Sequence, residues 1–199
     1  MYRESTDRRF LKNRTALRRA CIDLSLEQGF TSLKVKDIAE RADVNRMTFY
    51  AHYDSPADVI CEFTDSIVRD IEEQCAKYDH FDTAVFFQCA TEAMYREIDF
   101  FRMVATDESC AFCRMQFRSA FEKLFKEELS RSAKQTDFEF EVVADALASG
   151  VTYAFLDWLA GKYGDASLDE LIATLNSLID AASGILASSA RSESDSAAL

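Results

Sequence analysis

Proline and glycine are so scarce in this chain that it can form few tight turns. Its 199 residues include one proline and five glycines. A β-sandwich or barrel needs turns at short intervals, and those turns draw heavily on these two residues. The scarcity therefore predicts long, uninterrupted helices. Because 48% of the residues are hydrophobic, such helices can bury a sizeable core.

Apolar residues recur at three- and four-residue steps along most of the chain, which is the period of an amphipathic helix. We expect an all-α fold of about nine helices. The pattern predicts them over residues 8–28, 35–42, 46–53, 55–77, 82–97, 100–106, 109–131, 138–162 and 167–186. Residues 1–7 are expected to form a loose arm, and the small, polar residues 188–199 a disordered tail.

Local signals mark several helix ends. Gly29 is placed to end the first long helix. Asn45 can cap a short helix that starts at the next residue. Ser55, Pro56 and Asp58 together form the start of another helix, with a capping box and a proline at its first position. Further predicted caps are Asp82 and Ser167.

Residues 35–53 have the layout of a helix-turn-helix: two short helices joined by a tight turn at Asp43-Val44. The second helix of such a module enters the DNA major groove with its N-terminal residues first. Phe49 is expected to pack inward. The candidate DNA contacts carry donors or positive charge suited to bases and phosphates: Lys34, Lys36, Asn45, Arg46, Thr48, Tyr50, His52 and Tyr53.

Charge is distributed unevenly along the chain, whose formal net charge is -12. Residues 1–54 hold 11 Lys/Arg and 8 Asp/Glu, a net charge of +3, and the remainder is at -15. A basic head on an acidic body is compatible with DNA binding, because phosphate contact is local. We expect a DNA-binding domain over residues 1–54 and a helical effector-binding and dimerisation domain over 55–187.

The N-terminal third resembles the TetR family of transcriptional regulators. The resemblance lies in Asp7-Arg8-Arg9, in Gly29-Phe30 and in the continuous run VKDIAERADVNRMTFYAHY at 35–53. It implies an all-helical homodimer that binds a palindromic operator as a repressor and is released by a small molecule. By position, it implies DNA contacts at Lys36, Asn45, Arg46, Thr48, Tyr50 and His52. A weaker resemblance continues at 98–102, at 149–151 and at Trp158.

Two residues depart from the pattern of that family. Lys34 stands where a threonine or serine usually caps the second helix, so the cap is lost or comes from Ser32. Met47 stands where a small residue is usual. Its side chain either restricts the approach to DNA or contacts a thymine methyl group.

The body is rich in aromatic residues, which suit either an effector pocket or a plain helical core. Polar-tipped rings are the better pocket candidates, because a buried hydroxyl or indole N–H needs a partner. The predicted effector-binding residues are Tyr95, Phe101, Tyr153 and Trp158. The last two predicted helices, 138–162 and 167–186, are the expected dimer helices, although their apolar stripes could also pack within one chain.

Cys110 and Cys113 are three residues apart and therefore share one face of a helix. They could bind a metal, form a redox pair, or be ordinary reduced thiols. A zinc site would need two further ligands, and the chain has two histidines, His52 and His80. We expect no metal site and no cofactor.

Two other classes of protein compete with a DNA-binding regulator. An enzyme is not expected, because the sequence has no nucleophile elbow, phosphate loop or HExxH motif and presents no catalytic residues. An acidic helical interaction protein stays open as an alternative. We expect a cytoplasmic protein without a membrane partner, since the longest apolar run, 151–159, is interrupted by Asp157.

Overall fold

The computed structural model describes residues 2–78, 83–132 and 138–196. Over these ranges it is helical and contains no strand, which confirms the all-α prediction. The elements are α1 (Tyr2–Gln28), η1 (Phe30–Ser32), α2 (Val35–Arg41), α3 (Arg46–Tyr50), α4 (Pro56–Cys75), α5 (Thr83–Arg96), α6 (Ile98–Thr106), η2 (Glu108–Cys110), α7 (Ala111–Ser132), α8 (Phe138–Leu159) and α9 (Leu168–Ser196).

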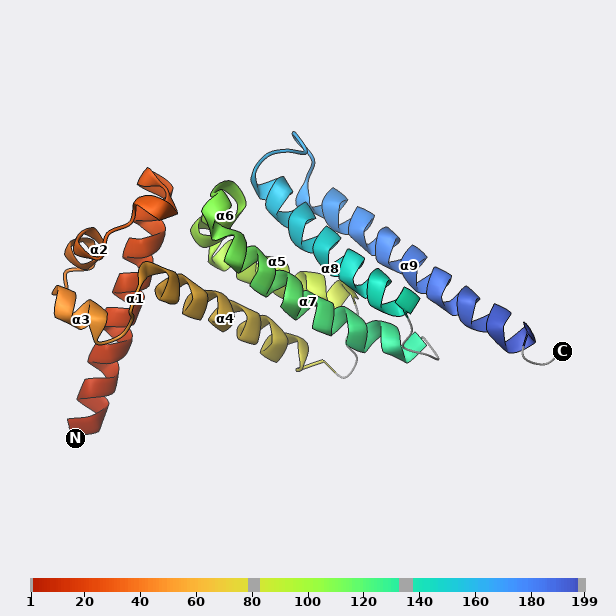
Figure 1. Cartoon of the computed structure of the whole chain (residues 1–199), viewed down its shortest axis with the longest axis horizontal. Coiled ribbons are helices and arrows are strands. Elements are labelled where there is room, and N and C mark those ends of the chain that lie inside the picture. Colours follow the sequence, from red (N-terminus) through yellow and green to blue (C-terminus); the bar gives the residue numbers. More distant parts are fainter. Residues whose placement is uncertain (1, 79–82, 133–137, 197–199) are drawn as a thin grey trace.

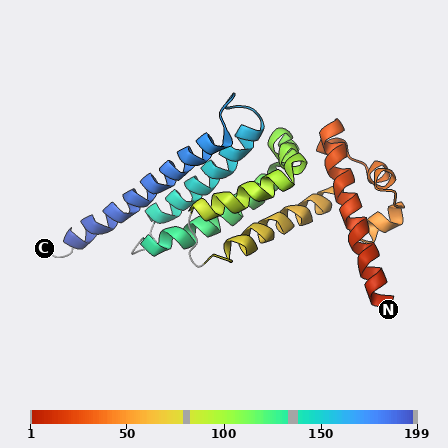
Figure 2. The same cartoon turned by 180° about the vertical axis from the view of Figure 1, so that it is seen from behind.

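The helices form a small head and a longer body (Figure 1). Helices α1, α2 and α3 make the head at one end, and α4 leads from it into the body. There α5, α7, α8 and α9 extend away from the head, and α8 and α9 run side by side along one edge in both views (Figures 1 and 2). Helix α6 lies at the end of the body that faces α1, with which it is in contact.

The predicted helix ends are confirmed where they depend on local hydrogen bonds. Gly29 follows α1 with a φ of 82°, a left-handed conformation that a glycine adopts without strain. The Asn45 side chain accepts a hydrogen bond from the Thr48 backbone N–H at 2.7 Å and so caps α3. Ser55 and Asp58 form the predicted reciprocal capping box at the start of α4.

The predictions of a loose N-terminal arm and a disordered C-terminal tail are wrong. Helix α1 begins at Tyr2, so residues 2–7 are helical rather than a loose arm. Helix α9 continues to Ser196, so most of the predicted disordered tail is helical. Neither segment contains a glycine or proline, and the alanine, arginine and glutamate residues of the tail are good helix formers. The predicted cap Asp82 and residues 197–199 lie outside the described residues.

The core runs continuously from the head into the body. In the head, Leu17, Ile38 and Phe49 are fully buried and hold α1, α2 and α3 together. The body core is largely aromatic, and many of its rings meet edge to face, as Phe86 does with Phe121 at a centroid separation of 4.9 Å. This aromatic packing positions the helices that surround the cavity described below.

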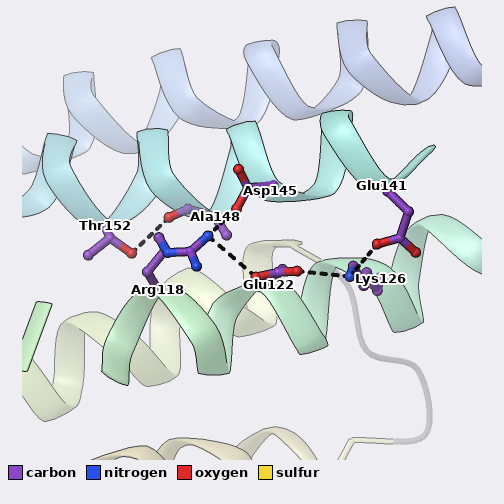
Figure 3. Close-up of polar contacts among 7 residues, drawn as sticks. All are labelled: Arg118, Glu122, Lys126, Glu141, Asp145, Ala148 and Thr152. Atoms are coloured by element: carbon purple, nitrogen blue, oxygen red, sulfur yellow. Dashed lines mark hydrogen bonds and ion pairs between the residues drawn. The ribbon is translucent and has the colours of Figure 1, made fainter. Parts of the chain in front are cut away.

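A ladder of charged side chains joins α7 to α8 (Figure 3). Arg118 pairs with Asp145 of α8 and, at 3.4 Å, with Glu122 on its own helix. Lys126 bridges Glu122 at 2.8 Å and Glu141 of α8 at 2.6 Å. Exposed ion pairs contribute little stability singly, so the ladder chiefly favours one alignment of the two helices.

Helix α8 is unusually apolar. Among the described residues, it is the one helix long and apolar enough to cross a membrane by length and composition. It also contacts α6, α7 and α9 and buries Phe140, Leu147 and Val151. The core helix of a globular domain has the same composition, so packing accounts for its apolarity.

Candidate nucleic-acid interface

Helix α3 lies on the surface of the head and has one exposed face. Arg46 is exposed, Met47 is 82% exposed and Tyr50 is 52% exposed. On the opposite face Phe49 is fully buried, as predicted. The short helix is therefore anchored by one aromatic residue and leaves the side chains of its first turn accessible, which is the geometry needed to enter a major groove.

Asn45 and Thr48 are partly committed to holding α3 together. The Asn45 side-chain oxygen accepts hydrogen bonds from the Thr48 backbone N–H and, at 3.1 Å, from the Thr48 hydroxyl. The cap thus uses the oxygen of Asn45 and the hydroxyl proton of Thr48. The Asn45 amide nitrogen and the lone pairs of Thr48 are the groups that can contact bases or phosphates.

The start of α2 adds positive charge beside α3. Lys34 occupies the N-cap position and makes no side-chain capping hydrogen bond, so the departure at this position does cost the helix its cap. Both Lys34 and Lys36 are exposed. Uncapped N–H groups at a helix start, flanked by lysines, favour phosphate.

Tyr53 does not lie where a DNA contact requires it. Its residue is 7% exposed, and its hydroxyl donates to Glu62 of α4 at 3.3 Å and accepts from Arg14 of α1 at 3.2 Å. Burial raises the pKa of this hydroxyl. The predicted contact is therefore corrected: Tyr53 ties α1 to α4, because the packing of those helices encloses the ring.

His52 is half-buried against α1, where its ring lies 4.4 Å from that of Phe10. Its Nδ1 atom is buried and has no hydrogen-bond partner among the described residues. Burial, and then the charge of Arg14, lower the pKa of His52. The lowered pKa favours the neutral imidazole, which can contact a phosphate as a hydrogen-bond donor.

The head is fastened to the body through η1 and η2. The Phe30 backbone N–H donates to the Asp107 carboxylate at 2.6 Å, and the rings of Phe30 and Phe112 lie 5.7 Å apart. Burial alone would raise the pKa of Asp107, but hydrogen bonds from the Phe30 and Ser109 N–H groups and the Ser109 hydroxyl outweigh it and lower that pKa. Asp107 follows α6 directly, so this carboxylate connects α6 to the head.

The body contains an apolar cavity between α4, α5, α6, α7 and α8. Its volume is about 410 Å³, including the part open to solvent. The lining residues are Ile71, Ala90, Met94, Phe101, Phe117, Phe121, Thr152, Phe155 and Leu156. The part of it that the centre of a water-sized sphere can reach is about 30 Å³, so a small-molecule ligand must displace side chains of the wall.

The outer edge formed by α8 and α9 exposes small and apolar side chains. Val142, Gly150 and Tyr153 are exposed along one face of α8, and Leu178 is exposed on α9. Positions eight and eleven residues apart share a helix face, so the three α8 residues form one stripe. An added Cβ at Gly150 would meet nothing within 4 Å, which leaves this stripe open to a partner.

Comparison with known proteins identifies the head. Residues 18–60 match the family model described as bacterial regulatory proteins, tetR family. This segment contains α2, α3 and the start of α4. The chain has the fold of a TetR-family regulator.

Two solved structures extend the TetR-type likeness to the body. One, from Syntrophomonas wolfei, is described as a TetR-family transcriptional regulator; it has a TM-score of 0.71 and 14% identity, over 86% of this chain and 94% of that one. The other is FadR of Thermus thermophilus, a TetR-family repressor solved with lauroyl-CoA; it has a TM-score of 0.55 and 20% identity, over 83% and 92%. At these identities the likeness concerns the fold. No curated protein matches the chain.

In this TetR-type body, one of the four predicted effector-binding residues lines the cavity and the other three do not. Phe101 lines the cavity, whereas Tyr95 and Tyr153 are 58% and 48% exposed and lie outside its lining. The Trp158 indole also lies outside the lining, and its N–H donates to the Ala166 carbonyl at 2.7 Å. The lining phenylalanines were part of the aromatic pattern of the body. A preference for rings with a polar group does not select these phenylalanines. The polar groups of the predicted residues are instead exposed to solvent, in Tyr95 and Tyr153, or bonded to the backbone, in Trp158.

The two neighbouring thiols of the TetR-type body, those of Cys110 and Cys113, are poorly suited to redox chemistry. Cys110 and Cys113 are both free and fully buried, and burial raises the pKa of each to about 12. Thiolate is the reactive form, so these groups are unreactive near neutral pH. Among the described residues, no three His, Cys, Asp or Glu side chains cluster in a way that could hold a metal.

Replacing Tyr53 with phenylalanine is expected to lower the free energy of unfolding by about 1 kcal/mol, because it removes a hydroxyl that hydrogen-bonds to Arg14 and Glu62. Base preference should not change. Tyr50→Phe is the matched control: its hydroxyl is on an exposed residue, so stability should hold while DNA affinity falls. Denaturant unfolding and DNA titration measure both effects. If Tyr53→Phe keeps its stability but binds DNA more weakly, Tyr53 is a DNA contact after all.

Replacing Asp107 with alanine is expected to destabilise the protein by about 1.5–3 kcal/mol, the contribution of hydrogen bonds to a charged group. Because the folded-state pKa of Asp107 is lowered, its stabilisation is complete above the ordinary carboxyl pKa near 4 and is lost as the pH falls through the folded value. Urea unfolding between pH 7 and pH 3 should show that the difference in unfolding free energy between the wild type and Asp107→Ala becomes smaller as the pH falls. Asp165→Asn, at an exposed loop residue, should follow the wild type throughout; a constant gap for Asp107→Ala would contradict the assignment.

Proposed function

We propose that this protein is a DNA-binding transcriptional regulator that binds a palindromic operator as a homodimer and is released from it by a small molecule. The observation that carries the proposal is the exposed face of α3, where Arg46, Met47 and Tyr50 are accessible while Phe49 anchors the helix. These residues belong to the segment that matches the tetR family model. Arg46 supplies donors for base edges, and Tyr50 supplies a hydroxyl for a base or a phosphate.

The charges of the chain support docking through the head alone. Lys34 and Lys36 place positive charge at the start of α2 in the head, whereas the region from residue 55 onward carries a net charge of -15. The acidic body repels DNA and so favours contact through the head. We place the DNA-binding domain in residues 1–54 and the effector and dimerisation domain in 55–187. The proposal includes a cytoplasmic location and no enzymatic activity.

Dimerisation is proposed through α8 and α9. The stripe formed by Val142, Gly150 and Tyr153, together with Leu178 of α9, is apolar or small and is exposed in the single chain. A second copy that packs the same stripe in reverse would bury it in a four-helix arrangement. The resulting twofold axis would place two copies of α3 on half-sites one turn of DNA apart or a multiple of it.

Release by a small molecule is proposed from the cavity and from its connection to the head. Phe101 lines the cavity and belongs to α6, which leads directly to Asp107 and its hydrogen bond to Phe30 of the head. A ligand that displaces Phe101 would therefore alter the position of the head. The structurally similar FadR, a repressor, was solved with lauroyl-CoA, which supports the assignment of an effector and of repression.

Selection of bound DNA from a random library tests the proposed function directly. A palindromic consensus, bound with one dimer per site, is the expected result. Affinity for that site should fall with salt at a log–log slope of about -0.9 for each phosphate neutralised. Failure to enrich any sequence, together with binding that does not respond to salt, would refute the proposal and favour an acidic protein-interaction module.

A further inference from the structure

We infer that the body cavity takes an uncharged, largely apolar ligand with a flat aromatic or alicyclic portion. The inference rests on the proposed function, since it names the chemical class of the effector. It follows from the side chains that line the cavity and from the ion pairs that cations of α7 already make.

The wall of the cavity carries no charged side chain. Its one polar lining residue is Thr152, whose hydroxyl donates to the Ala148 carbonyl at 2.8 Å (Figure 3). The hydroxyl proton is therefore already in use, and the lone pairs of the oxygen are what a ligand meets. Such a wall accepts one O–H or N–H from a ligand but gives a carboxylate or phosphate no donor, so an anion would lose its hydration without compensation.

Two cations of α7, the helix that supplies Phe117 and Phe121 to the wall, are committed to ion pairs. Arg118 follows the lining residue Phe117 in α7, but its guanidinium pairs with Asp145 and Glu122 (Figure 3). Lys126, two turns further along, pairs with Glu122 and Glu141. An anionic ligand would have to break this ladder to gain a partner from α7.

The aromatic residues of the wall favour a flat ligand. The rings of Phe101 and Phe117 are nearly parallel, at 25° and 5.2 Å, and Phe121 lies 6.1 Å from Phe117. Rings arranged in this way offer both faces and edges to another ring. Phe101 is also the lining residue on the helix that leads to the head, so a ligand against its ring acts where the cavity and the head are connected.

Displacement of an uncharged fluorescent probe, N-phenyl-1-naphthylamine, from the full-length protein tests the ligand class. Three competitors of the same shape are compared: 2-methylnaphthalene, 2-naphthoate and 2-naphthylmethylammonium. The neutral compound is expected to compete at a concentration at least about 100-fold below the carboxylate at pH 7.5, because a carboxyl group with a pKa near 4 is almost fully ionised there. The gap to the carboxylate should narrow by about tenfold for each unit that the pH is lowered towards 6, as the neutral acid becomes available.

A pair of variants on α5 ties this binding to the cavity. Ala90 lines it, and Ala84 is exposed on the same helix. Ala90→Phe is expected to lower probe affinity by at least about tenfold, because the added ring occupies the ligand space. Ala84→Phe should bind the probe as the wild type does.

Each outcome bears on the ligand class separately from DNA binding, which is measured on the same samples without competitor. Equal or tighter competition by the carboxylate or the ammonium compound would overturn the inference. Absence of probe binding, or an Ala90→Phe variant that folds and still binds the probe fully, would also overturn it. Because the competitor series uses the wild-type protein, the inference stays testable even if Ala90→Phe does not fold. Loss of DNA binding by the wild type would instead count against the proposed function.

Discussion

Gly150→Arg is expected to give a folded monomer whose affinity for a palindromic DNA site is at least about 100-fold below that of the wild type. Its Cβ would meet nothing within 4 Å, and arginine is a better helix former than glycine by roughly 0.5–1 kcal/mol, so the single chain should fold at least as well. In the proposed dimer, however, two arginines would be forced into an apolar face near the twofold axis. Loss of the second half-site removes an avidity gain of about 10²–10⁴.

Light scattering and DNA titration check this expectation together. Ser119→Arg is the matched control, because Ser119 is exposed on α7 rather than on the α8 stripe. It should remain dimeric and bind DNA as the wild type does. A Gly150→Arg protein that is still dimeric and binds the palindrome at full affinity would show that the dimer forms through another surface.

Arg46→Ala is expected to weaken binding by about 1–3 kcal/mol per half-site and to relax base preference at one position in each half-site, because an arginine in a groove reads a base edge. Lys36→Ala should behave differently. A phosphate contact carries no sequence information, so all sequences should weaken alike and the salt slope should fall by about 1 per subunit. Competition assays with single-base variants of the selected site, at several salt concentrations, separate the two effects.

Arg69→Ala serves as the charge-matched control for both variants, because Arg69 is an exposed arginine in the middle of α4 in the body. It removes the same charge and should change neither affinity nor preference. If Arg46→Ala lowers affinity without altering preference, Arg46 is a phosphate contact, and base reading would fall to Met47 and Tyr50. If Arg46→Ala has no effect at all, α3 is not the recognition helix.

Met47 was the most ambiguous residue in the sequence, and the structure sharpens its role. At 82% exposure it projects from α3 between the polar side chains on either side of it. If α3 enters the major groove as proposed, this side chain meets DNA, and its apolar end would contact a thymine methyl group. The alternative, that it restricts the approach to DNA, predicts tighter binding by Met47→Gly, which the same competition assays would detect.

Local features of the sequence determined where most helices begin and end. A cap such as Asn45 or Ser55 acts on a backbone N–H three residues later, and a glycine such as Gly29 ends a helix through its own φ. These interactions need no distant partner, so they can be read directly from the order of residues. The start of α3 could be predicted for the same reason.

Only the tertiary structure decided which side chains are exposed, and therefore able to contact DNA or a ligand. Phe49 and Tyr53 lie about one turn apart and both are buried. For Tyr53, the partners of its hydroxyl are Arg14 of α1 and Glu62 of α4, which lie in segments far apart in sequence. In the body, the same kind of packing leaves Tyr95 on the surface and directs Phe101 into the cavity. The period of a helix tells which residues share a face, but the face that is buried depends on how several helices meet.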